Sequence, residues 1–84
     1  MNATTRVLSV LASEPEAVMS AETAHALANK RASTPLALST VKRALRHLRG
    51  AGLAEADEFY DRKTNRRINH WSATSEGIRE NTYL

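Results

Sequence analysis

The chain contains no cysteine, which excludes disulfides, thiolate metal ligands and cysteine nucleophiles. Long apolar runs are also missing, so the sequence contains neither a signal-peptide core nor a membrane-spanning segment. Aromatic residues are scarce, with one Phe, one Trp and two Tyr. The core must therefore be built mainly from Ala, Leu and Val. In a chain of 84 residues, such a thin core leaves no room for a large ligand cavity.

This length predicts a single domain over residues 1–84, with its core at about 4–80. Twelve Lys and Arg against nine Asp and Glu give a net charge of +3. Residues 1–41 hold three basic and three acidic residues, so the whole excess lies in residues 42–84. Most of the basic residues form two clusters, one of Lys42, Arg43, Arg46 and Arg49 and one of Arg62, Lys63, Arg66 and Arg67. Clustered positive charge predicts a polyanionic partner.

Apolar spacing predicts two helices in the first third of the chain, over residues 4–13 and 20–30. Thr4 or Thr5 is expected to cap the first helix, and Ser20 the second. Residues 17–19 between them are expected to be extended. In the second helix the predicted buried stripe consists of Ala24, Leu27 and Ala28, with Thr23 a further candidate, and His25 is expected to be exposed.

A third helix is predicted over residues 35–49, with Thr34 as its cap and Pro35 at its first position. Ser39 is an alternative start. Leu38, Val41, Leu45 and Leu48 are spaced to line one face of this helix. The opposite face carries Ser39, Thr40, Lys42, Arg43, Arg46, His47 and Arg49. Gly50 and Gly52 are expected to end the helix.

The remaining segment changes period and predicts a β-hairpin, with strands at 53–60 and 66–73 around a polar turn at 61–65. Trp71 and Ala73 are expected on the buried face, and Ile68 and His70 on the other. A short last helix is predicted at 76–81, although Gly77 weakens that prediction. The fold class is therefore α+β and mainly helical, with helices two and three joined by a short turn.

In this order the elements resemble the winged helix-turn-helix DNA-binding domains of bacterial and archaeal regulators. Residues 39–53 are similar to a recognition helix and its exit, which in these families show STV, then R-x-L-x-x-L, then AGL. Residues 61–67 resemble the wing of MarR-type proteins, and residues 71–77 resemble the Y-S-L-T-x-x-G that follows the wing in MarR and PadR relatives. Residues 20–27 are similar to the first helix of the helix-turn-helix. The resemblance implies a three-helix core, a β-hairpin wing and a short C-terminal helix.

The sequence departs from this pattern in three ways. Ala73 stands where the family usually has Leu, and the turn before the third helix is longer than usual. The chain also has no counterpart of the long dimerisation helices of MarR and PadR proteins. The segments left over for dimerisation are residues 1–3 and 80–84, which end in Tyr83 and Leu84.

The resemblance and the charge pattern together identify candidate DNA-binding residues. In the recognition helix these are Ser39, Thr40, Lys42, Arg43, Arg46 and His47. In the wing they are Arg62, Lys63, Arg66 and Arg67. Arg43 is the first candidate for base contact, because arginine forms bidentate hydrogen bonds to guanine in the major groove. Arg66 and Arg67 are expected on opposite faces of their strand, so that only one of them would reach DNA.

Little in the sequence supports a metal site or an enzyme active site. The three histidines lie on different elements without metal-ligand spacing, and Ser39 and His47 are two helical turns apart, too far for a nucleophile–base pair. Asp61 is expected to pair with an arginine of the turn. Trp71 is expected in the core, the alternative being a platform on which a base stacks. The sequence therefore predicts a protein that is not an enzyme and has no metal or cofactor.

The favoured function is sequence-specific binding of double-stranded DNA by a small transcriptional regulator, located in the cytoplasm at the nucleoid. A homodimer or a partner protein on DNA is expected, with neither a membrane partner nor a small-molecule effector. Three alternatives remain open: a winged-helix adaptor that binds proteins, a phage or plasmid replication or recombination factor, and RNA binding by the same basic face. The target sequence and the choice between activation and repression are not predicted.

Overall fold

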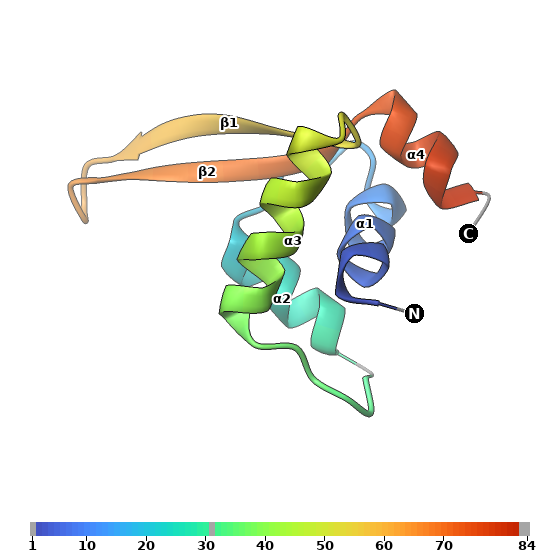
Figure 1. The fold of residues 1–84 in the computed structure, drawn as a ribbon. Coiled ribbons are helices and arrows are strands. Elements are labelled where there is room, and N and C mark those ends of the chain that lie inside the picture. The colour runs from blue at the N-terminus through green and yellow to red at the C-terminus, as the bar shows by residue number, and fades with distance from the viewer. Residues whose placement is uncertain (1, 31, 83–84) are drawn as a thin grey trace.

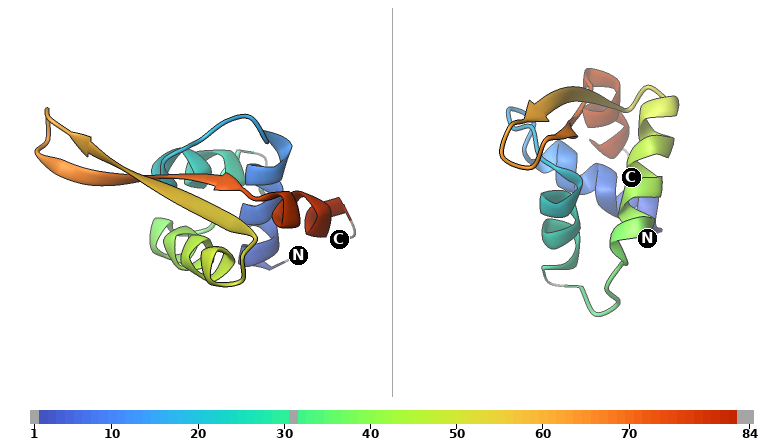
Figure 2. Two further views of the ribbon diagram at one scale, coloured as in Figure 1. Left: turned by 90° about the horizontal axis from the view of Figure 1, so that it is seen from above. Right: turned by 90° about the vertical axis from the view of Figure 1, so that its left-hand side faces the viewer.

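The computed structural model describes residues 2–30 and 32–82. Three helices pack around a common core, and an antiparallel hairpin extends from one side of them (Figures 1 and 2). A fourth helix follows the hairpin and lies at the end of the molecule away from the hairpin tip (Figure 1). The elements in chain order are α1 (Ala3–Ser13), α2 (Ala21–Asn29), α3 (Leu38–Gly50), β1 (Ala54–Asp61), β2 (Arg66–Ala73) and α4 (Ser75–Thr82). This is the mainly helical α+β architecture that the sequence predicted.

The cap of α1 differs from the prediction. Asn2 caps the helix by accepting a hydrogen bond from the Thr5 N–H through Oδ1 at 2.8 Å, so neither threonine is the cap. Asparagine is among the best N-cap residues because its short side chain reaches the free amides of the first turn. Of the terminal segments considered for dimerisation, Met1, Tyr83 and Leu84 lie outside the described residues. Ala3 and Glu80 belong to α1 and α4.

Ser20 caps α2 as predicted, accepting from the Thr23 N–H at 3.1 Å. The buried stripe of the helix is different from the predicted one. Ala21 and Ala24 are buried, whereas Leu27 is 40% exposed and Thr23 is also exposed. His25 is half-buried instead of exposed. The buried and half-buried residues 21, 24, 25 and 28 repeat at helical spacing and form one face. This face is rotated about the helix axis relative to the predicted one.

The loop before α3 explains why the predicted helix start is wrong. The Asn29 side chain holds both polar backbone groups of Leu36: Oδ1 accepts from its N–H at 2.8 Å, and Nδ2 donates to its C=O at 2.9 Å. His25 Nε2 lies 2.8 Å from the same carbonyl. Backbone held this way cannot continue a helix from Pro35. Helix α3 instead begins at Leu38, near the alternative start, with Ala37 as a cap that makes no side-chain hydrogen bond.

Arg6 connects α1 to this loop. Its guanidinium donates to the C=O of Thr34 at 2.8 Å and to the C=O of Ala28 at 2.9 Å. A cation at the last carbonyls of α2 also compensates the negative end of the helix dipole. Arg31, at the start of the predicted turn, lies outside the described residues.

We expect Asn29→Ala to destabilise the domain. The Leu36 N–H would lose its partner, and an unmet hydrogen bond of this kind costs about 1–3 kcal/mol when the group is shielded from water. Urea unfolding followed by circular dichroism measures the change. Asn69→Ala, at an exposed position of β2, is the control and should change stability much less. Equal stability of the two variants would contradict the role of Asn29.

The C-terminal end of α3 is closed by Gly52, which has φ of +78°. Its N–H donates to the Arg49 C=O at 3.1 Å, and the Leu53 N–H donates to the Leu48 C=O at 2.9 Å. These two bonds form a Schellman motif, which requires a left-handed residue at the position of Gly52. Gly50 is the last helical residue and does not interrupt the helix, so only one of the two predicted glycine stops acts as one.

The hairpin pairs β1 and β2 in register from Ala54 opposite Ala73 to Asp61 opposite Arg66. Its turn covers residues 62–65, and Asn65 adopts φ of 56°, a conformation that asparagine tolerates. Among the described residues, Asp61 forms no ion pair with an arginine. Its carboxylate instead accepts from the Lys63 N–H at 3.0 Å and from the Thr64 hydroxyl at 3.1 Å, which orders the turn.

The base of the hairpin is fixed to the helices through Trp71. The Met19 N–H donates to the Trp71 C=O at 2.9 Å, and the Trp71 N–H donates to the Met19 C=O at 2.7 Å. The Trp71 ring is 5% exposed and belongs to the core, as predicted. Most of the other core side chains come from the three helices: Val7, Leu8, Leu11, Ala21, Ala24, Val41, Ala44, Leu45 and Leu48. Ala54 and Ala73 extend the core into the hairpin base.

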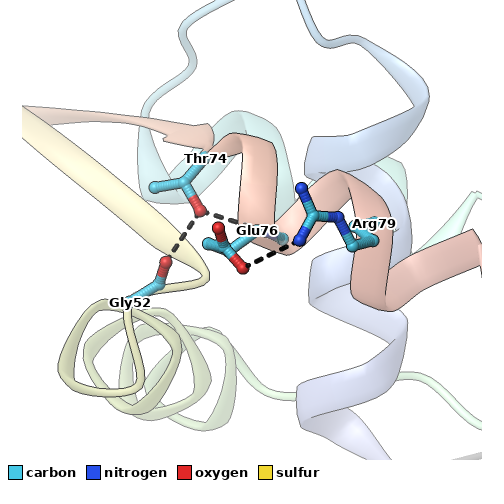
Figure 3. A network of polar contacts seen from close by, with 5 residues as sticks. Gly52, Thr74, Glu76 and Arg79 are labelled. Atoms are coloured by element: carbon cyan, nitrogen blue, oxygen red, sulfur yellow. Dashed lines mark hydrogen bonds and ion pairs between the residues drawn. The ribbon is translucent and has the colours of Figure 1, made fainter.

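Thr74 joins the end of α3 to the start of α4 (Figure 3). Its hydroxyl donates to the Gly52 C=O at 2.7 Å and accepts from the Gly77 N–H at 3.0 Å. A Glu76–Arg79 ion pair lies on the same helix. Gly77 packs so closely that a Cβ there would collide with the Leu53 carbonyl. The glycine that weakened the prediction of this helix is therefore what lets the helix approach the junction.

We expect Gly77→Ala to destabilise the domain by about 1–3 kcal/mol, as overpacking of a tight contact does. Gly50→Ala is the matched control, because a Cβ there meets nothing within 4 Å. In the last turn of α3 it should be neutral or stabilising by up to about 1 kcal/mol. Thermal and urea unfolding of both variants measure the difference, and a Gly77→Ala variant as stable as the wild type would contradict the close approach.

Candidate nucleic-acid interface

The exposed face of α3 carries the polar side chains that the sequence predicted there. Val41, Ala44, Leu45 and Leu48 are buried on the other side of the helix. Ser39, Lys42, Arg43, Arg46, His47 and Arg49 are exposed, and Thr40 is half-buried. Helical spacing places Arg43 and Arg46 near the middle of the exposed face, on either side of the line opposite the core. Leu38, the first residue of the predicted apolar stripe, is half-buried and packs against the core. One helix therefore buries most of an apolar stripe and presents four cations to solvent.

A groove of about 470 Å³ lies between α3, the start of α2 and the hairpin. Five cations contribute to its lining: Lys42, Arg46, Arg49, Arg66 and Arg67. Among the described residues that line it, Glu22 is the only acid. The two basic clusters, separated in sequence by an acidic strand, thus meet across one groove.

The other flank of α3 is different. Arg43 and His47 line a smaller depression of about 170 Å³ together with Thr4 of α1. The predicted site residues of α3 therefore divide into two sets: Lys42 and Arg46 face the hairpin, and Arg43 and His47 face away from it. Ser39, near the N-terminus of the helix, lines neither depression.

The hairpin cations are also divided. Arg62 and Lys63 are exposed in the turn and lie outside the groove lining. Arg66 and Arg67 both contribute to that lining, although their alternation along the strand predicted that only one of them would. Arg67 Nη1 lies 3.3 Å from Glu58 Oε1 of the neighbouring strand. The side chains of this pair remain 79% and 53% exposed, so the interaction is a weak surface ion pair. Arg67 therefore lines the groove while its guanidinium is paired with the Glu58 carboxylate.

Arg49 is a groove residue that the sequence analysis placed on the polar face but did not select. Its Cζ lies 5.3 Å from the centroid of the Trp71 ring, above the ring face. The spacing of Lys42, Arg46 and Arg49, four and then three residues apart, is the signal that could have identified it, because it predicts one row along the helix.

The remaining candidate features are peripheral to the groove. The Phe59 and His70 rings contact each other on the hairpin, with their planes tilted by 38° and their centroids 4.6 Å apart. Within residues 2–30 and 32–82, no three His, Asp or Glu side chains come together as metal ligands would. Over the same ranges, none of the helices combines the length and apolar character needed to cross a membrane.

No protein-family model matches the chain, and no curated protein matches its sequence. Solved structures match the chain in fold. A candidate transcriptional regulator from Thermoplasma acidophilum superposes with a TM-score of 0.78 at 12% identity, over 93% of this chain and 74% of that chain. A PadR family transcription regulator from Clostridium difficile superposes with a TM-score of 0.78 at 15% identity, over 96% and 80% of the two chains. These two likenesses establish the fold.

The chain is a winged helix-turn-helix domain. Helices α2 and α3 form the helix-turn-helix, and the hairpin of β1 and β2 is the wing. A further structural neighbour, a candidate DNA-binding protein from Ralstonia eutropha, is 27% identical and superposes with a TM-score of 0.73. This likeness covers 98% of the present chain and 93% of that protein.

We expect Glu58→Gln to strengthen binding to polyanions, because it releases Arg67 and removes a negative charge beside the groove. Elution from immobilised heparin at a higher salt concentration measures this gain. Glu76→Gln is the matched control: it changes the net charge equally and breaks the Arg79 pair, but on α4. If both variants shift elution equally, net charge and not the release of Arg67 is responsible.

Proposed function

We propose that this winged helix binds double-stranded DNA in a sequence-specific manner and acts as a small transcriptional regulator. The observation that carries the proposal is the convergence of α3 and the wing on one groove lined by five cations and a single acid. A surface with this charge attracts a polyanion, and its sequence-independent contacts supply much of the affinity for DNA.

In this proposal α3 enters the major groove, which is wide enough to admit a helix. Arg43, at the middle of the exposed face, donates to the edge of a guanine, and Arg46 and Lys42 beside it contact bases or phosphates. Ser39 and Thr40, at the start of the helix, bind phosphate together with the free amides of the first turn. His47 contacts the backbone on the flank away from the wing.

In the same proposal the wing contacts the part of the duplex next to the one that α3 enters. Arg62 and Lys63 at its exposed turn approach the adjacent minor groove, where a narrow groove concentrates negative potential. Arg66 and Arg67 face the strand that passes between the wing and α3. The wing extends well beyond the helices, as Figure 2 shows, which suits contact with a neighbouring part of the duplex.

The similar proteins support the regulatory part of the proposal. The Clostridium difficile protein is a PadR family transcription regulator, and the Ralstonia eutropha protein is described as a DNA-binding protein. The proposed activity is binding without catalysis or cofactor, in the cytoplasm at the nucleoid. One such module covers only about 600–1,000 Å² on DNA, so a second copy or a partner protein would be needed for tight binding. We propose no small-molecule effector.

Selection of bound duplexes from a random pool, followed by titration of the preferred duplex and a scrambled one, tests the proposal. We expect Arg43→Ala to weaken binding of the preferred duplex by about 5- to 150-fold, the loss of about 1–3 kcal/mol of base discrimination. Binding of the scrambled duplex should change little. For the wild type, the logarithm of the affinity should fall steeply with the logarithm of the salt concentration.

Arg79→Ala is the control, because it removes the same charge from α4, at the end of the molecule away from the wing tip (Figure 1). It should bind both duplexes as the wild type does. Absence of duplex binding at low salt would overturn the proposal and favour a protein-binding adaptor. Equal affinity for preferred and scrambled sequences would overturn its sequence specificity, and tighter binding to RNA would change the partner.

A further inference from the structure

We infer that Arg49 binds a backbone phosphate of the DNA on the floor of the groove, and that Trp71 is the positioning residue that holds its guanidinium there. The inference rests on the proposed function and names the residues that hold one strand between α3 and the wing. It gives the single tryptophan of the chain a second role besides its place in the core.

The immediate surroundings of Arg49 distinguish it from the other arginines with defined contacts. Arg6 donates to backbone carbonyls, Arg67 pairs with Glu58, and Arg79 pairs with Glu76. Within the part of the chain that the structure describes, the Arg49 side chain makes neither an ion pair nor a hydrogen bond. Its one defined contact is the Trp71 ring, 5.3 Å from Cζ to the centroid.

Stacking of this kind orients a guanidinium without using its N–H groups. The attraction is between the cation and the negative face of the ring, so the N–H donors at the edge remain available. Those donors form a planar fork that matches two oxygens of a phosphate. A guanidinium that is already held in place also loses less conformational freedom when the phosphate arrives.

Both residues are attached to rigid backbone. Trp71 exchanges two backbone hydrogen bonds with Met19, at 2.9 and 2.7 Å. The Arg49 carbonyl accepts from Gly52 in the motif that ends α3. Side chains placed on fixed elements hold their geometry better than side chains on loops. Fixed backbone on both sides therefore holds the Arg49 guanidinium against the Trp71 ring.

The shape of the cationic surface favours a phosphodiester strand over a small anion. Lys42, Arg46 and Arg49 extend over about 10 Å of the axis of α3, at about 1.5 Å per residue. Arg66 and Arg67 line the same groove from the wing. A row of cations of this length matches successive phosphates of one strand, whereas a small anion would occupy only one part of it.

The first test compares Arg49→Ala with Arg43→Ala on the preferred and scrambled duplexes. We expect Arg49→Ala to weaken both by a similar factor, on the order of tenfold, because a phosphate contact carries no sequence information. The slope of log affinity against log salt should fall by about 0.9, the value for one phosphate. Arg49→Lys keeps the charge and should restore the slope but only part of the affinity. Arg79→Ala should change neither.

The second test begins with the fluorescence of Trp71 in the wild-type protein. Wild-type emission should change when either duplex binds. The emission of Arg79→Ala should change in the same way, because this variant keeps both Arg49 and Trp71. Trp71→Phe keeps an aromatic face of smaller size, so it should lower affinity less than Trp71→Leu. Trp71→Leu should weaken binding less in the Arg49→Ala background than in the wild type, since the contact with Arg49 is already lost there. Thermal melting confirms that each variant is folded.

The outcomes separate this inference from the proposed function. Duplex binding by wild type with an unchanged Trp71 emission, together with unchanged affinity and salt slope for Arg49→Ala, would overturn the inference and leave DNA binding intact. A loss in Arg49→Ala confined to the preferred duplex would also overturn it, because Arg49 would then contact bases. Failure of the wild type to bind any duplex would overturn the proposed function itself.

Discussion

The position of the wing depends on the seating of Trp71. Its backbone exchanges two hydrogen bonds with Met19, and its ring lies in the core below α3. A two-stranded hairpin is only marginally stable by itself in water, so it needs such an attachment to hold a fixed direction. Without it, the cations of the wing would have no defined distance from those of α3, and the groove between them would not exist.

The base of the hairpin is fixed a second time, at the junction of α3 and α4. Gly52 ends α3 with a left-handed turn, and the Thr74 hydroxyl links its carbonyl to the first turn of α4. Gly77 allows α4 to approach this turn closely. Both strands therefore leave the body of the domain from constrained backbone, one after Gly52 and one before Thr74, and only the part beyond Trp71 projects freely.

The arginines show why a net charge of +3 says little about function. Arg6 is a structural residue that supports the loop before α3, and Arg79 belongs to an ion pair on α4. Arg67 is tethered to Glu58, while Arg49 is stacked on a ring without an acidic partner among the described residues. Arginine side chains in this domain thus support a loop, form ion pairs or line a candidate binding surface. The surroundings of each arginine determine which of these roles it has.

Local patterns in the sequence determined the elements. The apolar spacing of α3, the Ser20 cap, the period change at the hairpin and the two basic clusters depend on nearby residues, and the structure confirms them. The alternative start of α3 at Ser39 lies one residue from the observed start at Leu38. The start at Pro35, the buried face of α2 and the role of Asp61 were predicted wrongly. Each depends on a partner outside its own helix or on the backbone conformation of a turn, as Asn29 and Leu36 show.

The sequence alone therefore determined which residues are basic, which helix carries them and the winged-helix order of the elements, because these follow from residue type and period. Only the tertiary structure decided which cations meet. Lys42 and Arg49 face the wing while Arg43 faces away, and Arg49 lies over Trp71, which is 22 positions later in the sequence. That arrangement follows from how the wing docks on the helices, a long-range packing result that no local pattern contains.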